Sequence, residues 1–238
     1  MPDIKVKNLT VTYIDKKKNE TVAVRGLSAR FDAGTLNVVM GFSGCGKTTL
    51  LKAIAGFFAF DGYIYFDGKD ADTNPTRKRN LAYVSQDYVL YPSLTVFDNI
   101  AFPLKTARLK RDEVTERVRA IAETFGLTDC LTRLPKHLSG GQQQRVAIAR
   151  AMVKHPNLIL MDEPLSNVDT ESREMLRRYI RGVQTSEGVT VLYVTHDYRE
   201  ALELADRIYV MDEGQLVFEG TPDEVRMSEN ETVALLRQ

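Results

Sequence analysis

Residues 41–48 have the composition and spacing of a loop that binds phosphate groups. They match the pattern G-x-x-x-x-G-K-[ST], with an apolar run before them and a helical pattern after them. Glycines let the backbone curl until its N–H groups face the phosphates, and the helix adds the positive end of its dipole. We therefore expect Lys47 to reach the β- and γ-phosphates of a nucleotide and Thr48 to hold Mg²⁺. Unless the loop is only a glycine-rich cap of a structural helix, the nucleotide-binding residues here are Gly41, Ser43, Gly44, Cys45, Gly46, Lys47, Thr48 and Thr49.

Two adjacent carboxylates end the apolar run Leu158–Met161. In an open α/β sheet, ligands bind at the carboxyl ends of the strands, so Asp162 and Glu163 would lie beside the phosphate loop if the two strands are neighbours. Asp162 would then bind Mg²⁺ directly or through water, and Glu163 would polarise the water that attacks the phosphate. The alternative is a strand that simply ends in solvent-exposed acids. These residues alone fit a kinase, a GTPase or one of several ATPases.

Residues 138–145 read Leu-Ser-Gly-Gly-Gln-Gln-Gln-Arg and predict a second helix start that binds an anion. Ser139 supplies a hydroxyl donor and caps the helix, and Gly140 and Gly141 allow a close approach to the ligand. A chance occurrence of the first five residues has odds well below roughly one in a thousand, given ordinary amino-acid usage. With this motif the chain resembles an ATP-binding-cassette (ABC) nucleotide-binding domain, along nearly its whole length and in the order of its motifs.

The resemblance implies an α/β fold with a P-loop NTPase (RecA-like) core. This core has a mostly parallel sheet, an N-terminal antiparallel β subdomain and an inserted α-helical subdomain. The resemblance also implies a single ABC ATPase domain over residues 1–238. In that domain, residues 1–88 and 155–238 form the catalytic core with the antiparallel β subdomain, and residues 89–154 form the helical subdomain that carries the 138–145 motif. The implied reaction is hydrolysis of ATP with Mg²⁺ as cofactor.

The resemblance gives roles to residues that mean little by themselves. Tyr13 resembles the aromatic residue that stacks on adenine, with an ordinary core or edge tyrosine as the alternative. Gln86 resembles the glutamine that contacts Mg²⁺ and water, His196 resembles the switch histidine that senses the γ-phosphate, and Ser166–Asp169 resembles the loop that crosses to a second subunit. The implied catalytic residues are Glu163, His196, Lys47 and Gln86; the metal ligands are Thr48, Gln86 and Asp162; the remaining nucleotide-binding residues are Tyr13, Ser139, Gly140, Gly141, Gln142 and Asp169.

The resemblance further implies a head-to-tail dimer with a second ABC ATPase subunit, which is an identical chain or a paralogue, closing over two MgATP. Transmembrane permease subunits and an extracytoplasmic solute-binding protein are the other expected partners, and no nucleic acid is expected.

Segment 89–104 is too apolar for a plain surface loop, so it lines a groove for a partner's helix or packs between lobes. The sequence of this segment is similar to that of ATPase subunits of bacterial solute importers, particularly of the sugar-uptake type. Those importer subunits usually continue into a C-terminal regulatory β-domain. Here that domain is expected to be absent or removed. An exporter ATPase and a soluble non-transport ATPase of translation or DNA repair stay open as alternatives.

The elements that must position these residues follow from hydrophobic periodicity. Strands are expected over 4–13 and 21–31, around the turn Asp15–Glu20 and with a bulge near Asn8, and over 60–67. Nearly continuous apolar runs predict buried parallel strands, and helix-period stretches alternate with them. The buried strands are expected over 36–40, 81–85, 158–161 and 189–195, a late antiparallel pair over 207–211 and 215–219, and helices over 47–55, 112–125, 142–153, 170–185, 198–205 and from Thr221 onward.

Composition limits the classes of protein. Lys plus Arg and Asp plus Glu number 32 each in 238 residues, so no net field draws the chain to nucleic acid or anionic lipid. The two cysteines, Cys45 and Cys130, form no C-x-x-C pair and suit a reducing cytosol. No apolar run approaches the roughly 20 residues that cross a bilayer, and no secretion signal is evident. We therefore expect a protein of the cytosol or one that is peripheral to a membrane, and the resemblance implies the second, at the cytoplasmic face of the cell membrane.

Overall fold

A six-stranded sheet forms the centre of the protein. The computed structural model describes residues 1–14, 17–76, 79–166 and 168–237. The strand order is β10-β9-β3-β8-β7-β6, in which only the pair β9–β10 is antiparallel. The strands are β3 (Leu36–Met40), β6 (Leu81–Val84), β7 (Leu158–Asp162), β8 (Thr190–Thr195), β9 (Arg207–Asp212) and β10 (Gln215–Gly220). The predicted fold class, an α/β core with a mostly parallel sheet, is confirmed.

The central strands are buried on both faces, as their apolar runs predict. Val39 and Val194 pack on the side of α1 (Lys47–Ala55), whereas Val38 and Tyr193 pack on the side of the other helices. The helices on that second side include α5 (Thr170–Glu187), α6 (Tyr198–Leu204), α7 (Pro222–Met227) and α8 (Glu231–Leu236). The sheet therefore lies between two layers, and the loops at its carboxyl edge are held from both sides.

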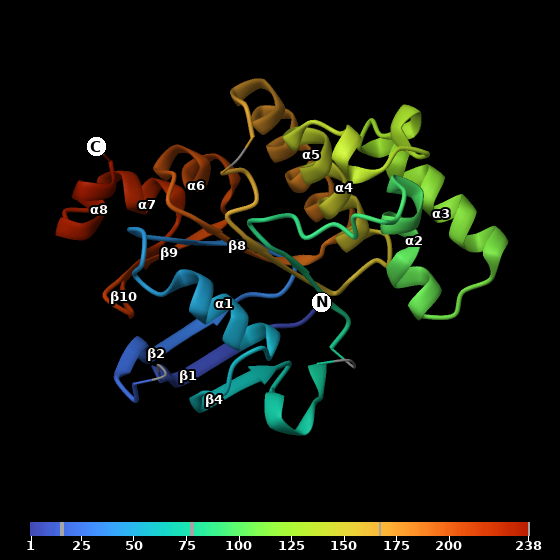
Figure 1. Ribbon diagram of the computed structural model, residues 1–238. Coiled ribbons are helices and arrows are strands. Elements are labelled where there is room, and N and C mark those ends of the chain that lie inside the picture. The colour runs from blue at the N-terminus through green and yellow to red at the C-terminus, as the bar shows by residue number, and fades with distance from the viewer. Residues whose placement is uncertain (15–16, 77–78, 167, 238) are drawn as a thin grey trace.

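A second, antiparallel sheet packs on the same core as α1 (Figure 1). Its order is β2-β1-β4-β5, with β1 (Ile4–Ile14), β2 (Glu20–Phe31), β4 (Asp61–Phe66) and β5 (Lys69–Asp70). The predicted bulge is present: the pairing of β1 with β2 shifts between Val6 and Leu9, and Asn8 has a φ of 47°. The predicted turn Asp15–Glu20 lies partly outside the described residues.

Between β6 and β7 the described chain contains helices and no strand. These are α2 (Val96–Thr106), α3 (Arg111–Thr124), α4 (Gly140–Met152) and the 3₁₀ turns η3 (Thr128–Cys130) and η4 (Pro135–His137). They form the lobe at the right of Figure 1. The periodicity predicted α3 and α4 but did not place α2, which contains Pro103. The division of the chain after residues 88 and 154 stays a prediction.

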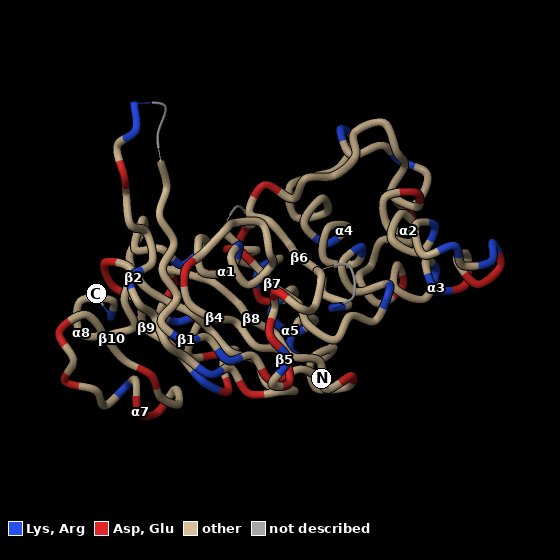
Figure 2. Tube along the Cα trace, turned by 90° about the horizontal axis from the view of Figure 1, so that it is seen from below, with Lys and Arg blue, Asp and Glu red and all other residues tan. Residues whose placement is uncertain are grey.

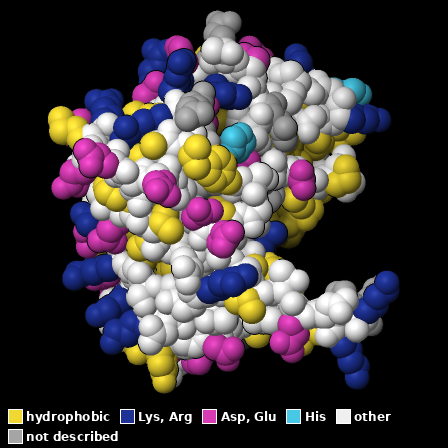
Figure 3. Space-filling view, turned by 90° about the vertical axis from the view of Figure 1, so that its left-hand side faces the viewer, with side chains coloured by type: hydrophobic (Ala, Val, Ile, Leu, Met, Phe, Trp, Pro, Cys, Tyr) yellow, Lys and Arg dark blue, Asp and Glu magenta, His cyan; other side chains and the backbone are white. Residues whose placement is uncertain are grey.

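Charges of both signs are spread over the molecule. Figure 2 shows Lys and Arg interspersed with Asp and Glu along the trace, and a hairpin that projects away from the body beside the label of β2. Figure 3 shows one face on which charged and hydrophobic side chains are mixed and which is hollowed above a projecting arm. Among the described residues, no helix has the length and apolar character needed to cross a membrane.

Candidate functional site

The loop after β3 has the backbone shape of a phosphate cradle. Gly46 has a φ of 104°, and a Cβ there would lie 2.2 Å from the carbonyl oxygen of Ala23. At Gly41 a Cβ would lie 2.2 Å from the carbonyl oxygen of Met211. Only glycine fits at these two positions. Since Gly46 is also the N-cap of α1, no side chain caps that helix, and its first N–H groups are left for an anion.

Lys47 folds back over this loop and is almost completely buried, with 4% of its surface exposed. Its Nζ donates hydrogen bonds to the carbonyl oxygens of Gly41 and Phe42, both at 2.8 Å. Within the described part of the chain, Lys47 forms no ion pair with a carboxylate. Its positive charge is therefore available to an anion that enters the loop.

Asp162, at the end of β7, is held by two hydroxyl groups. Thr48 Oγ1 donates to Asp162 Oδ1 at 2.7 Å, which joins the phosphate loop to the acidic strand end. The Tyr83 hydroxyl, from β6, donates to Asp162 Oδ2 at 2.9 Å. Burial, and next the charge of Asp162, raises the pKa of Tyr83 well above its usual value, so the phenol stays a donor at neutral pH. The structure thus brings the predicted metal ligands Thr48 and Asp162 together and adds Tyr83, which sequence reasoning missed.

Glu163 and His196 form a second polar pair at the same edge of the sheet. Oε2 of Glu163 lies 3.0 Å from Nδ1 of His196, although the two residues are 33 positions apart. Glu163 has a φ of 44°, a left-handed conformation that costs about 1–3 kcal/mol in a residue with a side chain. Its backbone is held there because its N–H donates to the Val194 carbonyl at 3.0 Å and the Ser166 hydroxyl donates to its carbonyl at 3.0 Å. A carboxylate that this backbone holds beside an imidazole is suited to accepting a proton from water.

Tyr13 and Gln86 are two further residues that the sequence places near the nucleotide. The Tyr13 hydroxyl lies 3.0 Å from Thr49 Oγ1, so this residue of β1 stands at the start of α1. Its ring meets the edge of Phe58 at 5.3 Å between centroids and is 38% exposed. Gln86 is exposed two residues after β6, and no hydrogen bond joins it to Thr48 or Asp162. The proposed roles of both residues stay predictions.

Ser139 begins α4 with a reciprocal cap. The Gln142 N–H donates to Ser139 Oγ at 3.2 Å, and the Ser139 N–H donates to Gln142 Oε1 at 3.0 Å. Ser139 and Gly140 are exposed, whereas a Cβ at Gly141 would meet Ser172 Oγ at 3.3 Å. In the described chain no hydrogen bond joins residues 139–142 to residues 41–49. Asp169 caps α5 at Ser172, and Asn167, two residues before it, lies outside the described residues.

Known proteins match both the sequence and the fold. The sequence profile of the family described as ABC transporter matches residues 24–166, which is more than half of the chain. The chain belongs to the ABC transporter family. The family predicted from the sequence motifs is therefore confirmed.

Individual members of the ABC transporter family cover most of the chain. It is 48% identical over 213 residues to the trehalose/maltose import ATP-binding protein MalK of Thermococcus litoralis, covering 87% of this chain and 57% of that protein. It is 43% identical over 218 residues to the spermidine/putrescine import ATP-binding protein PotA of Hahella chejuensis, covering 91% of this chain and 60% of that protein. The chain thus spans less than two thirds of the length of these relatives.

A solved structure matches the whole fold. The bacterial ABC transporter cassette MJ0796, described as dimeric, superimposes with a TM-score of 0.84 at 30% identity, covering 92% of this chain and 98% of that one. The same cassette, described as a dimeric post-hydrolysis state bound to ADP and Pi, gives a TM-score of 0.83. The arrangement of the two sheets and the helical lobe is therefore that of an ABC transporter cassette.

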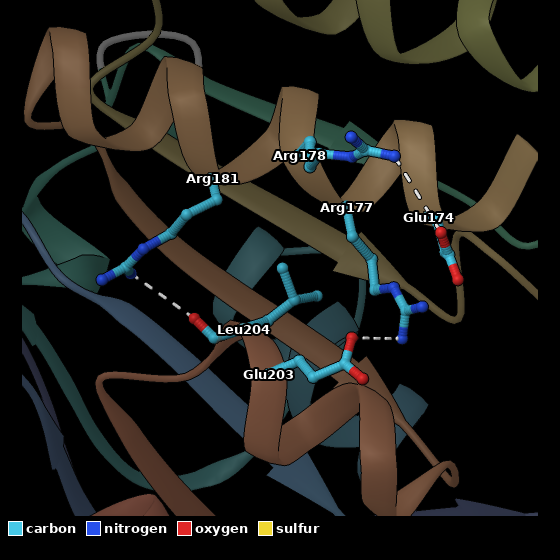
Figure 4. A pocket seen from close by; sticks show the side chains of 6 residues that line it. All are labelled: Glu174, Arg177, Arg178, Arg181, Glu203 and Leu204. Carbon is cyan, nitrogen blue, oxygen red and sulfur yellow. Dashed lines mark hydrogen bonds and ion pairs between the residues drawn. The ribbon is translucent and has the colours of Figure 1, made fainter.

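A further groove of this ABC transporter chain lies between α5 and α6 (Figure 4). It has a volume of about 300 Å³ and contains three arginines, but two of them are engaged in short ion pairs. Arg177 pairs with Glu203 at 2.7 Å and Arg181 with Asp206 at 2.6 Å. The groove contains none of the predicted site residues, and with its charges paired we assign it no ligand.

Proposed function

We propose that this chain binds ATP with Mg²⁺ and hydrolyses it. The observation that carries the proposal is the convergence of the glycine cradle, the Thr48–Asp162 pair and the Glu163–His196 pair at the carboxyl edge of one sheet. The dimeric MJ0796 cassette, described in a post-hydrolysis state with ADP and Pi, supports the same reaction. In an open α/β sheet this edge is where ligands bind.

The oxygen atoms around Thr48 and Asp162 fit Mg²⁺. A hydroxyl and a carboxylate are the hard oxygen donors that this ion prefers, and substrate phosphates complete its shell. Among the described residues no group of three or more His, Cys, Asp or Glu side chains could hold a metal ion by itself. When bound, Mg²⁺ would neutralise charge on the phosphate oxygens. Gln86 is proposed as a further ligand on the resemblance alone.

The chain's own residues then have distinct parts in the reaction. Lys47 exchanges its bonds to two neutral carbonyls for bonds to the β- and γ-phosphates, which are stronger because both partners are charged. Glu163 accepts a proton from the attacking water as the oxygen attacks the γ-phosphorus and the bond to the ADP oxygen breaks. His196 orients Glu163 and donates to the transferring phosphoryl group. Tyr13 offers its exposed ring to adenine.

We further propose that Ser139, Gly140, Gly141 and Asp169 act on the nucleotide of a second subunit. The 139–142 segment has no hydrogen bond to the chain's own phosphate loop, and the start of α4 faces outward at Ser139 and Gly140. A phosphate loop surrounds only part of the γ-phosphate, so a second anion-binding helix start would complete the site. The description of MJ0796 as a dimer supports this arrangement.

The proposed role of the hydrolysis is solute import through separate permease subunits, with an extracytoplasmic solute-binding protein, at the cytoplasmic face of the membrane. Both relatives are named import ATP-binding proteins, one for trehalose and maltose and the other for spermidine and putrescine. Since similar identity accompanies such different solutes, we leave the solute unassigned. Val89, Tyr91 and Phe102 are 63%, 40% and 39% exposed, and the last two rings pack at 4.5 Å, so we propose this apolar surface for the permease contact.

The variant Glu163→Gln tests the reaction. It keeps the size of the side chain and removes the proton acceptor, so we expect ATP binding to persist while turnover is lost. Phosphate release measures turnover, and titration with ATP measures binding. Lys105→Gln, which removes an exposed ion pair with Asp98, is the matched control and should hydrolyse ATP normally. Near-normal turnover in Glu163→Gln would contradict the assigned role.

A further inference from the structure

Glu200 is a buried carboxylate that the proposed reaction does not use. It belongs to the first turn of α6 and is only 4% exposed. Burial raises its pKa, and hydrogen bonds from Thr195 and Tyr193 oppose that rise. Burying a carboxylate costs free energy unless hydrogen-bond donors satisfy its oxygens, so Glu200 depends on the donors around it.

Both carboxylate oxygens of Glu200 accept hydrogen bonds from hydroxyl groups of β8. Tyr193 donates to Oε1 at 2.8 Å, and Thr195 donates to Oε2 at 2.5 Å. Tyr193 is fully buried, with none of its surface exposed, and lies in the sheet between β3 and β7. Tyr193 and Thr195 lie on the same face of β8, and both bind Glu200. Glu200 therefore joins the end of β8 to the core.

The Thr195 hydroxyl that Glu200 holds also accepts a hydrogen bond inside the turn that contains His196. The Asp197 N–H donates to Thr195 Oγ1 at 3.0 Å, and the Glu200 N–H donates to Asp197 Oδ1 at 3.0 Å. His196 stands between the two tied residues, and its side chain is 56% exposed. Its ring forms one hydrogen bond within the described part of the chain, to Glu163. The direction of the imidazole thus depends on the backbone of this turn.

A small cavity links Glu200 to the catalytic pair. It has a volume of about 50 Å³, and its walls include Glu163, His196, Thr195, Arg173 and Glu200. Glu200 consequently lies behind the Glu163–His196 pair, on the same cavity, instead of in a distant part of the core.

We propose that Glu200 is a positioning residue for His196: it fixes Thr195 and the following turn so that the imidazole stays against Glu163. This inference rests on the proposed ATP hydrolysis for its consequence in catalysis. Its structural part, the link from Glu200 to the His196 ring, does not depend on a nucleotide.

The kinetic test uses Glu200→Met, which keeps the length of the side chain and removes both acceptors. We expect kcat for ATP hydrolysis to fall by about tenfold to a hundredfold, as for a small misplacement of a catalytic group, with KM changed by less than about twofold. In the His196→Ala background, Glu200→Met should lower kcat no further, because Glu200 acts through the His196 imidazole, which that background lacks. An equal loss in both backgrounds would overturn the proposal.

Two further variants separate positioning from general destabilisation. Thr195→Val keeps the shape of the side chain but removes the hydroxyl that binds Glu200, so it should show the same loss of kcat. This variant also keeps the proposal testable if Glu200→Met does not fold. Gln184→Met is the matched control: Gln184 is also 4% exposed and donates to the Gly34 carbonyl at 2.7 Å, away from β8's carboxyl end. It should leave kcat unchanged. A normal kcat in Thr195→Val would overturn the proposal.

An NMR measurement without nucleotide completes the test. The chain has 3 histidines, so ¹³C-histidine labelling gives few ring signals, and His196→Ala assigns one of them. In Thr195→Val and Glu200→Met we expect the His196 ring signal to move while those of His137 and His155 stay in place. An unmoved His196 signal would overturn the proposal even if ATP is hydrolysed. If the wild-type chain fails to hydrolyse ATP, only the proposed function is contradicted, and this experiment still decides the link.

Discussion

Tyr83→Phe removes one oxygen atom from the centre of the site. The Tyr83 hydroxyl donates at 2.9 Å to Oδ2 of Asp162, whose residue is 5% exposed, so in the variant a buried carboxylate oxygen loses its donor. A hydrogen bond to a charged group contributes about 1.5–3 kcal/mol. We expect the free energy of unfolding to fall by about that amount, which corresponds to a decrease in Tm of about 3–12 °C for a chain of this size.

Urea denaturation and thermal unfolding measure this loss in the absence of nucleotide. Tyr63→Phe is the control, because Tyr63 is 55% exposed and stacks on Tyr65. Since Thr48 still binds the other oxygen of Asp162, the variant should fold, but its Asp162 should be less well oriented and half-saturation with Mg²⁺ should need a higher concentration. A Tm equal to that of Tyr63→Phe would refute the reasoning.

Three other changes test the loop, the helical lobe and the buried acid. Gly46→Ala places a Cβ 2.2 Å from the Ala23 carbonyl at a φ of 104°, so we expect loss of nucleotide binding in a titration; binding as in the wild type would show that the cradle tolerates a side chain. Thr95→Ala removes the N-cap of α2, a bond of 3.1 Å to the Asp98 N–H, and should cost about 1 kcal/mol in urea denaturation, against less than about 0.5 kcal/mol for the exposed control Thr106→Ala. The raised pKa of Glu200 means that the folded state favours its protonated form, so this contribution to stability is present below the unfolded pKa of about 4.5 and is lost as pH rises through the folded pKa. Glu200→Gln does not titrate, and its free energy of unfolding relative to wild type should therefore increase from acid to neutral pH; a constant difference would contradict the burial of a titrating carboxylate.

The sequence predicts the central sheet well because its strands are short, apolar and covered on both faces. Continuous runs such as Leu158–Met161 leave little choice of structure, and Gly41–Thr48 can be recognised without knowing its neighbours. The hydrophobic periodicity does not place α2, which contains Pro103. The helix is helped by Asn99, a fully buried side chain that donates to the carbonyls of Tyr91, Leu94 and Thr95, a bond network that no periodicity indicates.

The sequence pattern does not indicate Tyr83 and Glu200 as site residues, because their contacts join residues that the fold brings together. Tyr83 meets Asp162 across 79 positions, and only the pairing of β6 with β7 brings them together. Asp197 and Glu200 have the spacing of an ordinary helix cap, which would be solvent-exposed, yet the fold turns Glu200 into the core. Ser139 was expected to cap α4 and does so, whereas its contact with a phosphate needs a second subunit and stays a proposal.

The most direct test of the composite site is to mix two inactive variants. Lys47→Met disables the cradle, and Ser139→Glu places a negative charge where the partner's γ-phosphate should bind. In a head-to-tail dimer the mixed pair has one site with both defects and one with neither. The account therefore predicts that each variant alone is inactive and that an equal mixture regains about a quarter of the wild-type ATPase activity per chain. A mixture that stays as inactive as its two components, while both variants still bind one another, would contradict the claim that two subunits share each nucleotide.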